Sequence, residues 1–188
     1  MHAQQALRAY FVVALIAVLA ACGGSDHEGH SAKKDTFNNQ DIKFATEMIP
    51  HHVQATEMAA MAKDRSENPD VLDLAADIQK AQRPEIDIMS SWLDAWGKDM
   101  SGGHHSMEDM GDGEGMMSDT DLAELESKSG KAFDKQFLSL MIEHHEGAIA
   151  MAEVEEAKGR SPDAIALAKK IQADQAKEIT LMKSLLNN

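Results

Sequence analysis

An internal repeat constrains this chain more than any other feature of its sequence. When the sequence is shifted by 93 positions, residues 41–93 align with residues 134–186 without a gap, and more than a third of the aligned positions are identical. Self-similarity over such a length means that one structural unit occurs twice. The pairs of Met and His that match between the copies are Met48/Met141, His51/His144, His52/His145, Met58/Met151 and Met89/Met182. The fold must therefore place two equivalent units that carry the same Met and His pattern.

Each copy has the pattern of a helical hairpin. The dipeptides Asn68-Pro69 and Ser161-Pro162 occupy equivalent positions, and an N-cap residue followed by Pro is typical of a helix start. Sustained period-2 alternation is missing, which argues against strands. The sequence predicts helices near 36–65, 69–97, 131–159 and 162–187, with a short helix over 118–127 opened by a capping box of Ser118 and Asp121. We expect an all-α four-helix bundle built from two duplicated hairpins, repeat 1 over about 36–97 and repeat 2 over about 131–188.

The start of the chain has the features of a processing signal. Arg8 precedes an apolar run of 12 residues from Tyr10 to Ala21, which is too short to span a bilayer and typical of a signal-peptide core. The run ends in Leu19-Ala20-Ala21-Cys22, which resembles a bacterial lipobox. We expect residues 1–21 to be a lipoprotein signal peptide, Cys22 the acylated anchor on the bacterial membrane or envelope, and residues 22–35 a flexible tether. An ordinary secretory peptide with a chance Cys is the alternative.

Charge and composition exclude several classes of function. The net charge of -14 argues against a nucleic-acid binder and against a binder of anionic membranes, because both need basic patches. The single Cys cannot form an intrachain disulfide or a thiolate metal cluster. The chain has neither a nucleophile–base arrangement nor a nucleotide-binding loop. We therefore expect a protein that is not an enzyme, held to the membrane by its lipid anchor alone.

Polar residues occupy the core-facing stripe of each predicted hairpin. At helical spacing, His51 and Glu85 fall among apolar positions in the first copy, and His144 and Glu178 do so in the second. Counting residues from each hairpin turn places His51 opposite Glu85 and His144 opposite Glu178 near mid-bundle, with His52 and His145 at the flank. The two groups should lie close together whether the hairpins are parallel or inverted, provided that the helices are continuous.

Two prolines interrupt this pattern in the first copy only. Pro50 and Pro84 lie beside His51 and Glu85, whereas the second copy has Glu143 and Lys177 at these positions. A proline inside a helix removes a backbone hydrogen bond and kinks the helix. Paired kinks could open room for a ligand at the polar layer, and neutral drift in one copy explains the prolines equally well.

The polar layer has two readings. In one, His and Glu form a closed hydrogen-bonded network that sets helix register without a metal. In the other, His nitrogens and Met thioethers bind a soft metal ion, Cu(I) or its analogue Ag(I), with Glu completing the site. The candidate metal residues are Met48, His51, His52, Met58, Glu85, Met89, Met141, His144, His145, Met151, Glu178 and Met182. A carboxylate di-iron site is less favoured, because the Glu-x-x-His step that such sites use does not occur.

The segment between the hairpins, residues 98–117, is rich in Gly, Met and His and has no apolar periodicity. Its composition predicts a flexible crossover that captures soft metal ions with little geometric selectivity. A solvated acidic linker is the alternative. The accessory metal candidates are His104, His105, Met107, Met110, Met116 and Met117.

The phrases MIPHHVQATEMA and MIEHHEGAIAMA, with GMMSDTDLAELESKSGKAFDKQF, resemble the bacterial family known as domain of unknown function 305. The resemblance covers about residues 36–188. It implies a ferritin-like four-helix bundle in secreted or lipid-anchored proteins, and relatives of the CopM type are linked to copper binding outside the cytoplasm. The ligands implied by the motif are Met48, His51, His52, Met58, Met141, His144, His145 and Met151. Pro50 departs from the motif and makes the first half-site less regular.

Together these features favour an extracytoplasmic lipoprotein that binds copper for sequestration or transfer. Two alternatives stay open. One is a metal-free interaction or structural protein of the envelope, which needs no cofactor. The other is a ferritin-like redox metalloprotein.

Overall fold

The computed structural model describes residues 36–98 and 115–187. The predicted signal peptide, Cys22 and the tether lie outside these ranges, as do His104, His105, Met107 and Met110. Within them the chain forms helices and no strand, and no helix is both long and apolar enough to cross a bilayer. The helices are α1 (Asn39–Arg65), α2 (Pro69–Ala95), α3 (Asp119–Glu126), α4 (Gly130–Lys158) and α5 (Pro162–Leu186). The predicted four-helix bundle is confirmed, with each helix boundary within three residues of its predicted place.

Local sequence explains where most of these helices begin. Asn38 caps α1 by accepting hydrogen bonds from the backbone N–H groups of Gln40 and Asp41, and Asp41 completes a capping box. Asn68 and Ser161 cap α2 and α5 with Pro in the first turn, as the sequence predicts. The predicted capping box of α3 is also present. Short-range hydrogen bonds thus fix the helix starts without help from the rest of the fold.

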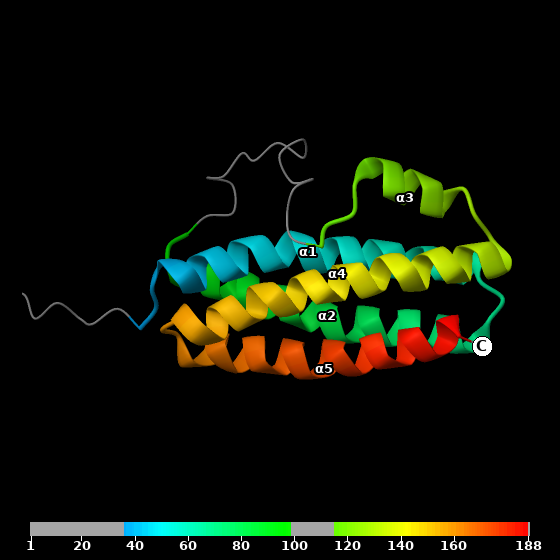
Figure 1. The fold of residues 1–188 in the computed structure, drawn as a ribbon. Coiled ribbons are helices and arrows are strands. Elements are labelled where there is room, and N and C mark those ends of the chain that lie inside the picture. Colours follow the sequence, from blue (N-terminus) through cyan, green and yellow to red (C-terminus); the bar gives the residue numbers. More distant parts are fainter. Residues whose placement is uncertain (1–35, 99–114, 188) are drawn as a thin grey trace, which may run out of the picture. The chain divides into compact units, whose positions relative to one another are not determined.

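The two hairpins pack against each other in inverted orientation. Helices α1 and α4 lie side by side, as do α2 and α5, and α1 runs antiparallel to α4 (Figure 1). The turn between α4 and α5 therefore lies at the start of α1, where Asp41 Oδ1 accepts hydrogen bonds from the N–H groups of Arg160 (2.9 Å) and Ser161 (2.8 Å). At the other end, Arg65 of α1 pairs with Glu126 of α3 at 3.4 Å. A pseudo-two-fold axis consequently relates the two copies and passes between α1 and α4.

The apolar core is divided into two clusters. One contains Phe44, Met48 and Ile49 of α1, and the other contains the later α1 residues Ala55, Met58, Ala59 and Ala62. Along α4 the order is reversed, because this helix runs in the opposite direction. Between the two clusters, α1 carries His51 and His52, and α4 carries His144 and His145. The four imidazoles thus form a layer at the middle of the bundle.

The two internal prolines do not end their helices. Helix α1 continues through Pro50, and α2 continues through Pro84. Pro84 is exposed and Pro50 is half-buried. The continuity that the sequence argument required is therefore present in both helices, and the polar residues keep their helical spacing across the prolines.

Candidate metal centre

Four histidines meet at the centre of the bundle. The ring centroids of His51 and His144 are 3.7 Å apart with an interplanar angle of 44°, and the rings of His144 and His145 are 6.4 Å apart. The side chains of all four histidines are buried, with relative exposures of 0–1%. Because His51 and His144 are equivalent in the repeat, they meet at the pseudo-two-fold axis. The prediction that the two clusters lie close together is confirmed.

The carboxylates pair with the other histidine of each copy. Nε2 of His52 lies 2.9 Å from Oε2 of Glu85, and Nε2 of His145 lies 2.6 Å from Oε2 of Glu178. The prediction that His51 faces Glu85 and His144 faces Glu178 is therefore wrong, as is the placement of His52 and His145 at the flank. The physical reason is that the buried stripe of a bundle helix is wide enough for two consecutive residues. The first histidine of each pair points across to the other hairpin, and the second points to its own.

Burial keeps the imidazole of His144 neutral. The pKa of His144 is held well below its usual value of 6.5, first by burial and then by repulsion from His51, His145 and His52. A neutral imidazole has a free nitrogen lone pair, which is the form that binds metal ions. His144 therefore carries no proton that a cation would have to displace at neutral pH.

The two halves of the layer differ in charge. Burial raises the pKa of Glu85, but hydrogen bonds from His52 and Lys170 outweigh this effect and hold the pKa below its usual value. Lys170 Nζ lies 2.8 Å from Oε1 of Glu85. In the repeat, Asp77 is the counterpart of Lys170, and Glu178 is the counterpart of Glu85. The first copy therefore has a carboxylate at the position equivalent to that from which the Lys170 ammonium group of the second copy contacts Glu85. The side chain of Glu178 is also more exposed than that of Glu85, at 20% against 8%.

Some ring nitrogens of His52, His144 and His145 are buried and face away from the carboxylates. Within the described part of the chain, Nδ1 of His52, Nδ1 of His145 and both nitrogens of His144 are buried without a hydrogen-bond partner. A carboxylate at Nε2 favours the tautomer with its proton there, which leaves the lone pair on Nδ1. Buried polar atoms without partners cost free energy, so their presence here is consistent with a metal-binding role.

Methionine side chains flank the histidine layer on both sides. The inverted packing sorts the six candidate methionines of the two repeats into two groups, each with two from one hairpin and one from the other. The groups are Met48, Met89 and Met151 in one apolar cluster, and Met58, Met141 and Met182 in the other. The sequence places Met48 near the height of Met89, but only the fold adds Met151 to them.

Across residues 36–98 and 115–187, no three or more His, Cys, Asp or Glu side chains converge in a way that could hold a metal ion. Imidazoles and carboxylates alone therefore do not complete a site there. Soft thioether donors lie beside the histidines, and imidazole with thioether is a ligand set that suits Cu(I). The donor chemistry of the layer fits this ion better than it fits iron.

The end of the Met-rich crossover docks beside the histidine layer. The side chain of Gln54 donates to the carbonyl of Met117 (2.9 Å) and accepts from its N–H (2.8 Å). Gly115 has φ +80°, and a Cβ there would lie 2.8 Å from Cα of Gly147 in α4. Met117 is buried in the same apolar cluster as Met58 and Met141, and Met116 is half-buried. Of the predicted accessory residues, these two lie within the described ranges, and Met117 belongs to the core.

Sequence reasoning missed one buried acidic pair. Glu155 of α4 is fully buried, and burial, followed by its hydrogen bond to Asp41 and the charge of Asp41, raises its pKa to about 8. Burial also raises the pKa of Asp41, but hydrogen bonds from Glu155 and from backbone N–H groups outweigh this and lower it. Glu155 occupies a core position where the first copy has Ala62. That mismatch between the copies is the signal that could have revealed the pair.

Comparison with known proteins agrees with this architecture. The family model described as "Domain of unknown function (DUF305)" matches residues 41–186. A DUF305 protein of Streptomyces coelicolor, described as secreted, is 34% identical with a TM-score of 0.73, covering 79% of this chain and 92% of that one. A DUF305 fragment from Deinococcus radiodurans is 33% identical with a TM-score of 0.73, covering 80% of this chain and 97% of that one. None of the curated proteins matches significantly.

A further similar structure is that of CopM. Its Cu(I)-bound form is 30% identical to this chain with a TM-score of 0.66, and the match covers 79% of this chain and 96% of CopM. CopM structures also include Cu(II)-bound, Ag-bound and apo forms. The family match spans most of this chain, and the shared helical bundle extends over nearly the whole of these relatives. The chain therefore belongs to the DUF305 family.

Proposed function

We propose that this chain is an extracytoplasmic lipoprotein, anchored through Cys22, that binds copper as Cu(I) in its mid-bundle layer of His and Met for sequestration or transfer. It acts as a binding protein and not as an enzyme. The ligands are drawn from the four paired histidines and the six flanking methionines, with Glu85 and Glu178 orienting His52 and His145. Met116 and Met117 extend this donor set at the end of the crossover.

One observation carries the proposal. Four fully buried imidazoles meet between two groups of buried or half-buried thioethers, and several of the ring nitrogens have no hydrogen-bond partner within the described residues. A closed polar layer that only set helix register would be expected to satisfy these atoms. The carboxylates already act on the outer nitrogens of His52 and His145, as they do on metal-bound histidines.

The similar structures add support for the choice of metal. CopM shares this bundle at 30% identity and has been crystallised with Cu(I), Cu(II) and Ag. Imidazole and thioether together favour Cu(I) and Ag(I) over harder ions such as Mg²⁺ or Ca²⁺. The lipobox-like Leu19-Ala20-Ala21-Cys22 supports the location outside the cytoplasm, where such a protein would meet copper imported into the envelope.

The metal-free alternative rests on the same layer. The bonds of His52 to Glu85 and of His145 to Glu178 join α1 to α2 and α4 to α5. Such bonds would fix the register of each hairpin even without an ion. In that case the chain would be an interaction or structural protein of the envelope, and the layer would bind no copper tightly.

Competition for Cu(I) separates these functions. The metal-depleted chain without residues 1–22 is titrated with Cu(I) against a chromophoric chelator, together with a variant in which all four paired histidines are Ala. A second variant, Met48→Leu with Met141→Leu, removes two thioethers and keeps the core volume. The matched control is Met61→Leu, which changes a half-buried methionine that packs against one apolar cluster but is not among the proposed ligands.

We expect the wild-type chain and Met61→Leu to take Cu(I) from the chelator, and both site variants to bind at least about tenfold more weakly, equivalent to 1.4 kcal/mol. Equal, weak binding by all four proteins would favour the metal-free function. Unchanged binding in the Met48/Met141 variant would show that these thioethers are not ligands. Oxygen-dependent turnover with iron would instead support a redox metalloprotein.

A further inference from the structure

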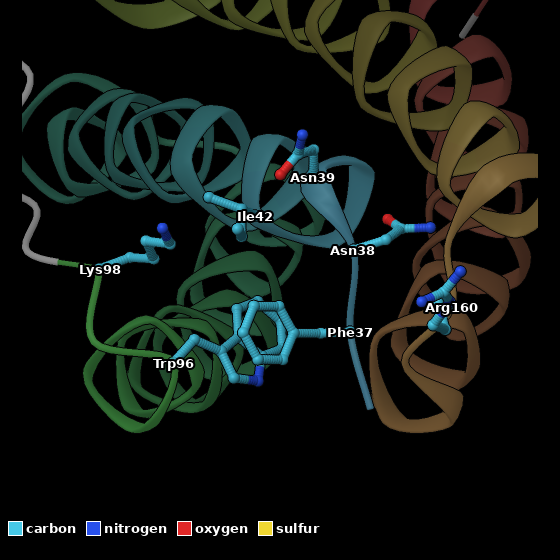
Figure 2. Close-up of a pocket in the computed structure, with 7 residues that line it drawn as sticks. All are labelled: Phe37, Asn38, Asn39, Ile42, Trp96, Lys98 and Arg160. Carbon is cyan, nitrogen blue, oxygen red and sulfur yellow. The ribbon is translucent and has the colours of Figure 1, made fainter. Parts of the chain in front are cut away.

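A pocket opens at the end of the bundle where α1 begins. Its volume is about 380 Å³ (Figure 2). The residues that line it come from the start of α1, the end of α2 and the turn between α4 and α5. They are Phe37, Asn38, Asn39, Ile42, Trp96, Lys98 and Arg160. This end of the bundle is opposite to the end at which α3 and the α1–α2 turn lie, and the pocket is separate from the histidine layer.

Stacked aromatic rings form one wall of the pocket. The rings of Phe37 and Trp96 stack with centroids 4.8 Å apart and an interplanar angle of 16°, and Trp92 stacks on Trp96 at 6.0 Å. All three are half-buried. The chain has only two Trp, so both lie at this end. Half-buried Trp and Phe with a polar surround are typical of protein surfaces that contact the interfacial region of a membrane.

Cationic and amide groups complete the pocket. Lys98 and Arg160 are exposed and lie on opposite sides of the aromatic pair (Figure 2). None of the lining residues is acidic, although the whole chain has a net charge of -14. Asp41, which bonds to the backbone of Asn38 and Arg160, is fully buried and does not present its charge to the pocket. Guanidinium and ammonium groups flanking a polar hollow suit a phosphate group.

The position of the pocket relative to the anchor decides which phosphate would reach it. Thirteen residues separate Cys22 from Thr36. A flexible linker of this length has an r.m.s. span of roughly 20 Å. Helix α1 has 27 residues and is about 40 Å long. The chain enters the bundle at Phe37 and Asn38, which line the pocket, so an anchor at Cys22 would be joined to the pocket end of the bundle and not to the α3 end.

We propose that this end of the bundle docks on the membrane, with the pocket receiving the anionic headgroup of a phospholipid and Phe37, Trp92 and Trp96 resting at the interface. This inference rests on the lipid anchor of the proposed function and adds an orientation to it. Docking turns a tethered domain into one with a fixed face toward the bilayer. The histidine layer is then held about half a helix length above the lipid.

Tryptophan fluorescence tests the docking directly, because both tryptophans lie at the pocket. The lipidated mature protein, residues 22–188, is reconstituted into vesicles of phosphatidylcholine alone, or with one third phosphatidylglycerol. Both kinds of vesicle carry brominated acyl chains that quench tryptophan on contact. We expect a blue shift and quenching in the anionic vesicles and much less in the neutral ones. Each cation near an anionic surface favours association by about fivefold, so the variant Lys98→Glu with Arg160→Glu should lose most of the quenching.

The matched control is Lys63→Glu with Lys131→Glu, which makes the same charge change on exposed lysines at the opposite end. It should be quenched like the wild-type protein. Equal loss in both variants would show nonspecific attraction and overturn the proposal. A second result would also overturn the proposal: inorganic phosphate changes the tryptophan emission saturably without vesicles, and anionic vesicles do not quench it. The pocket would then be a site for a small soluble anion.

Failure of docking and failure of anchoring give different results. A protein that floats with both kinds of vesicle but is quenched in neither is anchored and undocked, which overturns this inference alone. A protein that does not float with neutral vesicles lacks the anchor, and its quenching on added anionic vesicles still decides the docking. Cu(I) binding by the Lys98/Arg160 variant should equal that of the wild-type protein, since the pocket contains none of the proposed ligands.

Discussion

Replacing Glu155 by Gln should stabilise the protein increasingly as the pH rises. Glu155 is fully buried beside Asp41, and its pKa is raised from the usual 4.5 to about 8. Asp41 already accepts hydrogen bonds from the backbone N–H groups of Arg160 and Ser161, so it stays ionised and favours a protonated neighbour. Gln has nearly the same shape as protonated Glu, but it carries no charge at any pH.

The direction of the effect follows from proton linkage. Between pH 4.5 and about 8, Glu155 is ionised in the unfolded chain and protonated in the folded protein. The folded state therefore binds more protons, and its stability falls as the pH rises, by about 1.4 kcal/mol per pH unit while that difference is complete. Over the whole interval the loss has a ceiling of about 5 kcal/mol. Below pH 4.5 the wild-type and Gln proteins should be almost equally stable.

Urea denaturation at pH 5, 6, 7 and 8 measures this difference. His144 has the opposite effect, because its pKa is lowered in the folded state and acidification below 6.5 therefore destabilises the protein. That contribution is the same in wild-type and variant proteins, so it cancels in their difference. The control is Glu153→Gln, which removes the same charge from an exposed position of α4 and should change stability by less than about 0.5 kcal/mol at every pH.

The stability difference between Glu155→Gln and the wild-type protein should grow by several kcal/mol from pH 5 to pH 8, with unchanged m-values. A difference that does not vary with pH would refute the reasoning, because Glu155 would then have the same pKa in the folded and unfolded states. A variant less stable than the wild-type protein at pH 8 would refute it as well, since it would mean that the ionised carboxylate makes a favourable interaction.

Two further changes test the backbone beside the histidine layer. Gly115→Ala should destabilise the protein by about 1–3 kcal/mol and expose the buried Met117, because φ at Gly115 is +80° and the new Cβ would lie 2.8 Å from Cα of Gly147. Chemical denaturation measures the loss of stability, and an unchanged denaturation midpoint would contradict this prediction. Pro50→Glu introduces the residue found at the equivalent position of α4 and restores a helical N–H donor. It should raise stability by about 1–3 kcal/mol in the same assay, and a lower midpoint would show that the fold needs the proline.

Much of the architecture was predictable because it depends on short-range interactions. The Asn68-Pro69 and Ser161-Pro162 caps, the Ser118–Asp121 capping box and the helical spacing of the apolar residues all act within a few residues of one another. The 93-residue repeat then implied two like hairpins, and counting from their turns placed the polar groups at one height. These inferences needed no knowledge of how the hairpins pack.

The side-chain pairing within the layer was not predictable in the same way. Neighbouring residues on a helix point about 100° apart, and both His51 and His52 lie within the buried stripe. Which of them meets Glu85 depends on how α1 is rotated between α2 and α4. Helical spacing leaves the rotation of α1 about its own axis uncertain by about the 100° that separates two consecutive residues. The prediction therefore chose the wrong histidine in both copies.

The sequence by itself determined two helical hairpins, a repeated Met and His pattern, and membership of a family of helical bundles, because local periodicity and repetition are properties of the chain alone. Only the tertiary structure decided that the hairpins are inverted, that the ring of His51 meets that of His144, and that Met151 joins Met48. It also buried Glu155 beside Asp41, more than a hundred residues away in sequence. These contacts arise where surfaces of separate hairpins pack together, and their geometry depends on shape and charge complementarity that no local pattern encodes.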